Sequence, residues 1–290
     1  TFYEDFDGRR KGDKDYRSAS RDVARLVDEL RKEKLDGLLI DLRNNGGGSL
    51  RETVELTGLF IDKGPVVQQR RPDGKIGVES DEHAGVAWDG PLAVLINRGS
   101  ASASEIFAAA LQDYGRAPII GEPSFGKGTV QTLINLDDIA RNDKPKFGDL
   151  KMTVAQFFRV NGGTTQLRGV TPDIRFPSLA DDESYGEASY DNALPWIQIK
   201  AADFRPASDL GIRLPDLQRR HQARVAKGNV DPRQHNQDKQ RGQHEQHPGD
   251  DAAPASVHQP ADVGGELLRL GAGQHHAVIE GVQEAALGNP

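Results

Sequence analysis

Two short stretches of this sequence carry residues that could act together as a nucleophile and a base. Ser102 follows the strand-length apolar run 92–97 and precedes a helical apolar run over 106–111. A hydroxyl at a helix N-terminus lies among unpaired N–H groups and the positive end of the helix dipole, which suits a nucleophile and its oxyanion hole. Ser102 and Glu105 also fit a capping box, in which the serine only caps the helix. Both interpretations remain open from this stretch alone.

The second stretch supplies the candidate base. Lys127 stands between two glycines, so other backbone can approach it closely, and burial would lower the pKa of its ammonium group. The sequence contains no cysteine, which excludes a thiol nucleophile. His83 is the only histidine before residue 221 and lies in a polar stretch, so a Ser/His/Asp arrangement is poorly supported. A serine–lysine pair is the remaining option.

Two glycine-rich stretches also resemble nucleotide-binding loops. Residues 121–127 fit Gly-x-x-x-x-Gly-Lys, but Gly128 stands where a phosphate loop needs Ser or Thr, and a strand pattern follows instead of a helix. Residues 46–48 match half of a dinucleotide fingerprint, but Arg51 occupies the place of its third glycine. A P-loop nucleotide-binding protein is therefore a less favoured alternative.

Three segments, 36–48, 99–107 and 121–131, together resemble the carboxy-terminal processing peptidases in order and spacing. The chain is most similar to the bacterial periplasmic, tail-specific branch of that family, over roughly residues 1–227. The resemblance implies a crotonase-like α/β protease core, a periplasmic location, and cleavage of proteins at or near apolar, unstructured C-termini. It implies no metal or cofactor, and it allows an adaptor protein as a partner.

The resemblance also implies roles for individual residues. Ser102 would be the nucleophile and Lys127 the general base. Gln131 would orient the lysine. The backbone N–H groups of Gly48 and Ala103 would form the oxyanion hole.

Geometry limits two of the candidate residues. Asp113 lies eleven residues beyond Ser102 on the predicted helix, about 16 Å further along its axis, so we expect a supporting role for it. Gln131 would contact Lys127 on a helical turn but would stand about 13 Å away on a straight strand. Its proposed role predicts a helical turn or an equivalent bend after Gly126. The alternative is an ordinary exposed strand residue.

The elements that must position these residues are predicted by apolar periodicity, which indicates successive β–α units and an open α/β sheet. The first 17 residues read as a strand followed by a charged loop, and residues 137–147 as a polar loop. A hairpin is predicted at 161–163, leading into a strand over 164–167. Helices are predicted from about 20 to 36 and over 50–61, 102–114 and 214–226, and strands over 38–42, within 64–90, over 92–97 and 117–120, from 130 and over 150–160.

Three regions follow from the pattern: a protease core over 1–177, a C-terminal extension packing on it over 178–227, and a low-complexity tail over 228–290. The resemblance ends at the tail, which is rich in Gln, His, Gly and Pro and predicted to be disordered to about residue 262. Short helices are expected over 266–270 and 277–287. We interpret this end as out of frame or otherwise non-native. No ligand geometry makes His235, His244 and His247 a metal site.

Composition sets the outer limits. A net charge of −7 argues against nucleic acid as a partner, and no apolar run reaches membrane-spanning length. The resemblance places a PDZ domain before residue 1, so we expect this chain to lack an N-terminal portion and any signal peptide it carried. The alternative from another functional class is a non-catalytic peptide-binding fragment.

Overall fold

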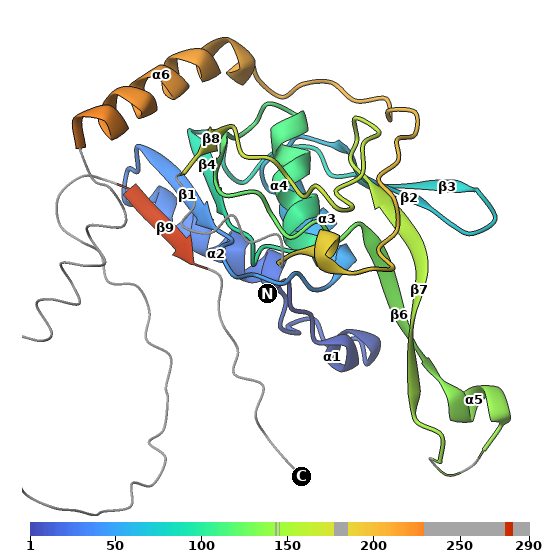
Figure 1. The fold of residues 1–290 in the computed structure, drawn as a ribbon. Coiled ribbons are helices and arrows are strands. Elements are labelled where there is room, and N and C mark those ends of the chain that lie inside the picture. Colours follow the sequence, from blue (N-terminus) through green and yellow to red (C-terminus); the bar gives the residue numbers. More distant parts are fainter. Residues whose placement is uncertain (143, 145, 177–184, 229–275, 281–290) are drawn as a thin grey trace, which may run out of the picture.

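The computed structural model describes residues 1–142, 144, 146–176, 185–228 and 276–280, which form a parallel sheet, an antiparallel sheet and the helices around them (Figure 1). The helices are α1 (Phe6–Arg10), α2 (Ala19–Arg31), α3 (Leu50–Gly58), α4 (Ala103–Asp113), α5 (Leu136–Ala140), the 3-10 helix η1 (Glu187–Ser189) and α6 (Leu210–Gly228). The strands are β1 (Gly37–Asp41), β2 (Gly64–Arg70), β3 (Ile76–Asp81), β4 (Leu92–Ile96), β5 (Ile119–Gly121), β6 (Thr129–Asn135), β7 (Asp149–Phe158), β8 (Ile174–Arg175) and β9 (His276–Glu280).

The parallel sheet has the strand order β8-β5-β4-β1-β9. The apolar strand β1 pairs with β4 in the register Leu38 to Leu92, as expected of a strand covered on both faces. The α/β fold class predicted from the sequence is confirmed. The expected helix over 277–287 is wrong at its start, because β9 pairs in parallel with β1. β-branched residues such as Val278 and Ile279 favour a strand, and the partner strand cannot be read from local periodicity.

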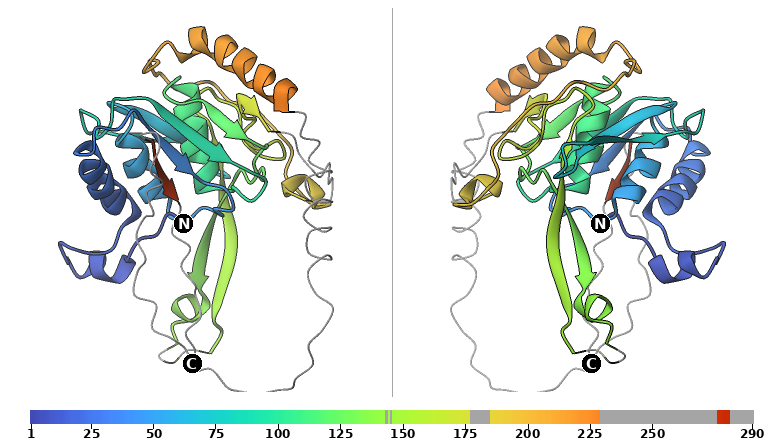
Figure 2. Two further views of the ribbon diagram at one scale, coloured as in Figure 1. Left: turned by 90° about the vertical axis from the view of Figure 1, so that its left-hand side faces the viewer. Right: turned by 90° about the vertical axis from the view of Figure 1, so that its right-hand side faces the viewer.

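The second sheet, with the order β3-β2-β7-β6, is antiparallel and replaces the single open sheet that the periodicity predicts. The hairpin of β2 and β3 turns at the predicted Pro72-Asp73-Gly74. Beyond the body of the protein, β6 and β7 continue as a two-stranded ribbon that ends at α5 (Figures 1 and 2). The position of β6 matters for function, because this strand begins two residues after Lys127.

Several local predictions need correction. Residues 6–10 form α1 inside the expected charged region, capped by the Asp5 carboxylate. Residues 136–140 form α5 in the expected polar loop, because the Asn135 side chain accepts two N–H groups of the first turn. Residues 164–167 are not a strand: the turn at 161–163 forms, but Gly163 pairs with Gln198 from the C-terminal segment. These outcomes depend on caps and on distant partners, which periodicity does not report.

The C-terminal segment lies against the core through α6, which begins at Leu210, before the predicted start. The Gln218 side chain donates to the Asp173 carbonyl at 2.9 Å, and the His221 ring stacks on Phe176. In Figure 2, α6 lies at the end of the molecule away from the tip of the β6–β7 ribbon. The predicted disorder over 228–262 and the helix over 266–270 lie outside the described residues. No helix in the described part of the chain is long and apolar enough to cross a membrane.

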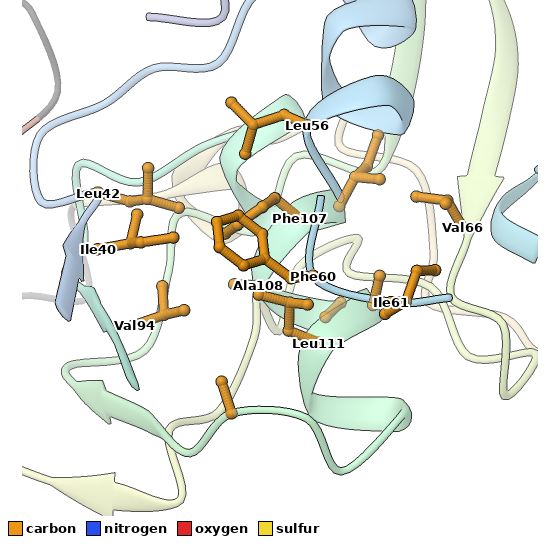
Figure 3. Packing of buried hydrophobic residues seen from close by; sticks show 14 of the residues in the cluster. Ile40, Leu42, Leu56, Phe60, Ile61, Val66, Val94, Phe107, Ala108 and Leu111 are labelled. Carbon is orange, nitrogen blue, oxygen red and sulfur yellow. The ribbon is translucent and has the colours of Figure 1, made fainter. Parts of the chain in front are cut away.

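The helix α4 is the centre of the hydrophobic core. Its residues from Ala103 to Leu111 are all buried, as expected for a helix that is apolar on every side. The Phe107 ring meets the Phe60 ring edge-on at 6.0 Å, and Figure 3 shows it pointing toward Ile40 and Val94 of the parallel sheet. The first residue of this helix therefore has a fixed position relative to β1 and β4.

Three loops leave the carboxyl ends of three neighbouring parallel strands. The glycine stretch 46–48 follows β1, Ser102 follows β4, and the loop containing Lys127 follows β5. In sheets of this kind the carboxyl ends of the strands are where ligands bind. The fold thus brings the three segments to one edge of the sheet, although they are far apart in the sequence.

Replacing Phe107 with alanine should lower the free energy of unfolding by about 3–5 kcal/mol, because the ring is fully buried and its loss leaves a cavity. Denaturant unfolding followed by circular dichroism measures this change. The control is Leu133→Ala on the ribbon, where the side chain is 67% exposed and the expected change is within about 0.5 kcal/mol. Equal effects of the two substitutions would contradict the assignment of α4 as the core helix.

Candidate active site

The backbone of Ser102 has an uncommon conformation. The residue caps α4 with φ 56° and ψ −112°, a region that residues with a side chain rarely occupy. The Ser102 N–H donates to Glu105 Oε2 at 2.8 Å, so the predicted capping box is present. A serine on a sharp strand-to-helix turn of this kind is typical of a nucleophile presented above a sheet. The site thus combines a cap with a strained backbone, which an ordinary cap does not need.

The glycine stretch after β1 lies directly against this turn. Gly47 has φ +104°, and a Cβ atom there would lie 2.9 Å from the Ala103 nitrogen and 3.0 Å from Ser102 Cβ. The Ala101 N–H donates to the Asn45 carbonyl at 3.0 Å, which ties the two loops together. Only glycine fits at position 47 without moving the serine.

Two backbone N–H groups beside Ser102 are without acceptors among the described residues. Gly48 bridges in parallel to Phe2 through the Gly47 carbonyl and the Ser49 N–H, so its own N–H points away from Phe2. The Ala103 N–H belongs to the first turn of α4, where no helical acceptor exists. Both groups are the ones that the sequence assigns to an oxyanion hole, and that role stays a prediction.

The carboxylate of Glu105 connects the serine turn to the lysine loop. Glu105 is fully buried, and four donors converge on it. Its Oε1 atom accepts from the Ser124 hydroxyl at 2.6 Å and from the Gly126 N–H at 2.8 Å. Its Oε2 atom accepts from the Ser102 N–H at 2.8 Å and the Lys127 N–H at 3.0 Å. Because one oxygen binds both groups, the backbone nitrogens of Ser102 and Lys127 are no farther apart than the sum of these two distances.

Burial of Glu105 raises its pKa from 4.5 to about 7, although its hydrogen bonds to Ser124, Gly126, Ser102 and Lys127 act in the opposite direction. Four donors match an ionised carboxylate, whereas removal from water penalises the charge. The two effects leave this group close to its protonation midpoint near neutral pH. Sequence reasoning recognises Glu105 only as a helix cap, and the capping-box spacing is the one signal that marks it.

Lys127 is half-buried, and its ammonium group makes no hydrogen bond or ion pair with any described residue. Burial lowers the pKa of Lys127, and the positive charge of Lys151 lowers it further, while Glu187 and Glu105 raise it. A lysine whose ammonium form is disfavoured is more readily a base. The predicted lowering of this pKa by burial is thus found in the structure.

The predicted helical turn after Gly126 is absent. Residues 122–128 have no regular secondary structure, and Gln131 is an exposed residue of β6 opposite Thr153. The strand has an irregularity between Val130 and Gln131, which is a bend rather than a turn of helix. The Gln131 side chain makes no hydrogen bond with Lys127 among the described contacts. Its role in orienting the lysine stays a prediction.

Asp113 lies at the far end of α4, away from the Ser102 turn. Its carboxylate pairs with the Arg159 guanidinium at 2.5 Å and accepts from the Asn161 amide at 2.8 Å. The Arg159 group also donates to Gln112 at 2.8 Å. These contacts fix the end of α4 to the segment after β7, which is the kind of supporting position expected from the helix geometry.

The structure contradicts the phosphate-loop alternative, because β6 rather than a helix follows Lys127. In the described part of the chain no group of three or more His, Asp or Glu side chains could hold a metal ion. The histidines at 235, 244 and 247 lie outside that part. The chemistry available at this site is therefore that of a hydroxyl, an amine and backbone N–H groups.

Comparison with known protein families gives two matches. Residues 3–176 match Peptidase family S41, and residues 180–245 match the C-terminal domain of tail specific protease. The second match continues beyond residue 228, where the sequence analysis expects the resemblance to end, so that expected boundary is wrong.

The chain is similar to three kinds of curated relative. It is 47% identical over 215 residues to a tail-specific protease of Haemophilus influenzae, covering 73% of this chain and 31% of the relative. It is 41% identical over 168 residues to a carboxy-terminal-processing protease of Bartonella bacilliformis, covering 55% and 35%. A chloroplastic carboxyl-terminal-processing peptidase of Arabidopsis thaliana is 37% identical, covering 57% and 31%. The chain thus spans about a third of the length of these relatives.

A solved structure titled photosystem II D1 C-terminal processing protease is 34% identical to this chain. The match covers 54% of this chain and 39% of that one, with a TM-score of 0.48.

Replacing Gly47 with alanine should displace the Ser102 turn, because the added Cβ atom would meet the Ala101 carbonyl at 2.8 Å. The control is Gly46→Ala, where nothing lies within 4 Å of the added atom. Amide hydrogen exchange over residues 100–106 should accelerate in the first variant only. The same exchange pattern in both variants would contradict the close approach of the two loops.

The pKa of Glu105 predicts how stability depends on pH. A carboxyl group whose pKa rises on folding contributes stability that is complete below pH 4.5 and is lost as pH increases through about 7. The loss amounts to about 3 kcal/mol across this range. Denaturant unfolding at several pH values should show a smaller decline with pH for Glu105→Gln than for the parent protein. Parallel curves for the two proteins would contradict the raised pKa.

Proposed function

Because the chain belongs to peptidase family S41, we propose that it is a serine peptidase in which Ser102 attacks the substrate and Lys127 is the base. The observation that supports this pairing is the Oε2 atom of Glu105, which accepts the backbone N–H groups of both residues. A second support is the low pKa of Lys127, which burial and Lys151 produce.

The proposed reaction proceeds through an acyl-enzyme. The neutral Lys127 amine takes the proton of the Ser102 hydroxyl while Oγ forms a bond to the carbonyl carbon of the substrate. The negative charge that develops on the carbonyl oxygen is stabilised by the N–H groups of Gly48 and Ala103. The Lys127 ammonium then gives its proton to the leaving amine as the peptide bond breaks. A water molecule, deprotonated by Lys127, releases the acyl group in the same way.

Two further residues have proposed supporting roles. Gln131 orients the Lys127 side chain, using the irregularity in β6 instead of a helical turn. Asp113 acts on the site only through α4, because its own partners are Arg159 and Asn161.

We propose that the substrates are proteins cleaved at or near apolar, unstructured C-termini, with an adaptor protein as a further partner. The names of the relatives, tail-specific and carboxy-terminal-processing proteases, support this substrate class. The proposed location is the bacterial periplasm, in line with the tail-specific relative, although chloroplastic relatives also match. No cofactor takes part in the proposed reaction.

Replacing Ser102 or Lys127 with alanine should abolish cleavage of an unstructured peptide with an apolar C-terminus, because each substitution removes one member of the pair. The matched control is Lys75→Ala in the β2–β3 turn, which removes an equal charge from an exposed position. Product formation followed by mass spectrometry measures turnover, and circular dichroism shows whether each variant is folded. Substantial cleavage by either folded alanine variant would rule out the serine–lysine mechanism.

The same assay separates the peptidase from a peptide-binding fragment. The chain spans about a third of its relatives, so the assay is run with and without an added PDZ segment. Cleavage under either condition, lost in Ser102→Ala, supports the peptidase. Peptide binding without cleavage under both conditions would favour the non-catalytic alternative.

A further inference from the structure

A segment of the C-terminal region contacts the lysine loop directly. The Glu187 N–H at the start of η1 donates to the Phe125 carbonyl at 2.9 Å. The Tyr185 ring packs edge-on against the Phe125 ring at 5.8 Å. A Cβ atom at Gly186 would lie 2.9 Å from the same carbonyl, so the backbone approaches this loop closely. These residues lie in the segment that matches the C-terminal domain of tail specific protease, outside the S41 match.

The side chain of Glu187 extends this contact toward Lys127. Its Oε1 atom accepts from the Gln166 amide nitrogen at 3.0 Å, and the Gln166 amide oxygen accepts the Gly128 N–H at 2.9 Å. Gln166 is fully buried, so its orientation depends on these partners. Glu105 holds the Lys127 N–H on one side, and the Glu187–Gln166 pair holds the Gly128 N–H on the other. The backbone of the lysine is thus fixed from two directions.

Three charged side chains face Lys127, each from a different element. Lys151 comes from β7, Glu105 from α4 and Glu187 from η1. The Glu187 carboxylate is bound to Gln166 and makes no ion pair with Lys127, so it leaves the amine free to act on a substrate. A negative charge at this position favours the ammonium form and opposes the effect of Lys151.

We propose that Glu187 is a positioning residue of the active site, which orients Gln166 against the lysine loop and places a negative charge beside Lys127. The proposal rests on the serine–lysine function proposed above. It makes the C-terminal segment a contributor to the site, rather than an appendage of the protease core. Glu187 touches neither the substrate nor the reacting atoms; it acts through Gln166 and through its charge.

The test separates the two effects of Glu187 by substitution. Glu187→Gln removes the charge and keeps an oxygen that accepts from Gln166, whereas Glu187→Ala removes both. Lys151→Gln removes the opposing charge. Asp191→Asn, at an exposed carboxylate close by in the sequence, is the matched control.

The pH dependence of kcat/KM is the informative readout, because its rising limb follows deprotonation of Lys127 in the free enzyme. We expect the limb of Glu187→Gln to move to lower pH by about half a unit or more, since the ammonium form loses a favourable charge. The limb of Lys151→Gln should move to higher pH, and that of Asp191→Asn should stay in place. Glu187→Ala should also lower kcat on the alkaline plateau by about tenfold or more, because the lysine loop loses a support.

A titration of the Lys127 side chain by NMR, with 13C-labelled lysine and Lys127→Gln for assignment, reads the same charge effect without turnover. If the parent protein shows no cleavage that depends on Ser102 and Lys127, the proposed function fails, while this titration still tests Glu187. If the parent cleaves but Glu187→Gln leaves both the limb and the titration unchanged, the inference about Glu187 is overturned and the proposed function stands.

Discussion

The site depends on one buried carboxylate that accepts four hydrogen bonds from three different segments. Glu105 begins the core helix, so its position is fixed by the packing of α4 around Phe107. Its two oxygens then fix the serine turn and the lysine loop relative to that helix. Two backbones that are far apart in sequence would otherwise have to be held in register by loop packing alone. A charge that is costly to bury is retained here because its partners are the parts that must be aligned.

The sheet explains why these segments can meet at all. The carboxyl ends of β1, β4 and β5 lie side by side, and each leads into one component of the site: N–H donors, hydroxyl and amine. A second layer of support comes from the other end of the chain, where Glu187 and Gln166 contact the lysine loop. The site is therefore shared between the two matched regions of this sequence, with the core helix between the sheets as its fixed reference.

Much of the fold follows from local sequence, but several parts of the site do not. Apolar periodicity places β1, β4 and α4 within a residue or two, because these elements are buried and periodic. It misses α5, which depends on the Asn135 cap, and β9, which depends on a distant partner strand. The roles of Glu105 and Glu187 could not be predicted, because their importance lies in hydrogen bonds to residues more than ten positions away. Gln131 shows the opposite error, since spacing suggested a helical turn where a bent strand is found.

The separation of the three loops along the chain bears on how the protein folds. The parallel pairs β1–β4 and β4–β5 join residues with long intervening segments, and contacts of this kind form slowly. The hydroxyl, the amine and the N–H donors are brought into register only when the whole sheet has closed on α4. A chain still emerging or partly collapsed has no assembled site. Neighbouring copies, which expose unstructured segments while they fold, are thereby protected from a peptidase of their own kind.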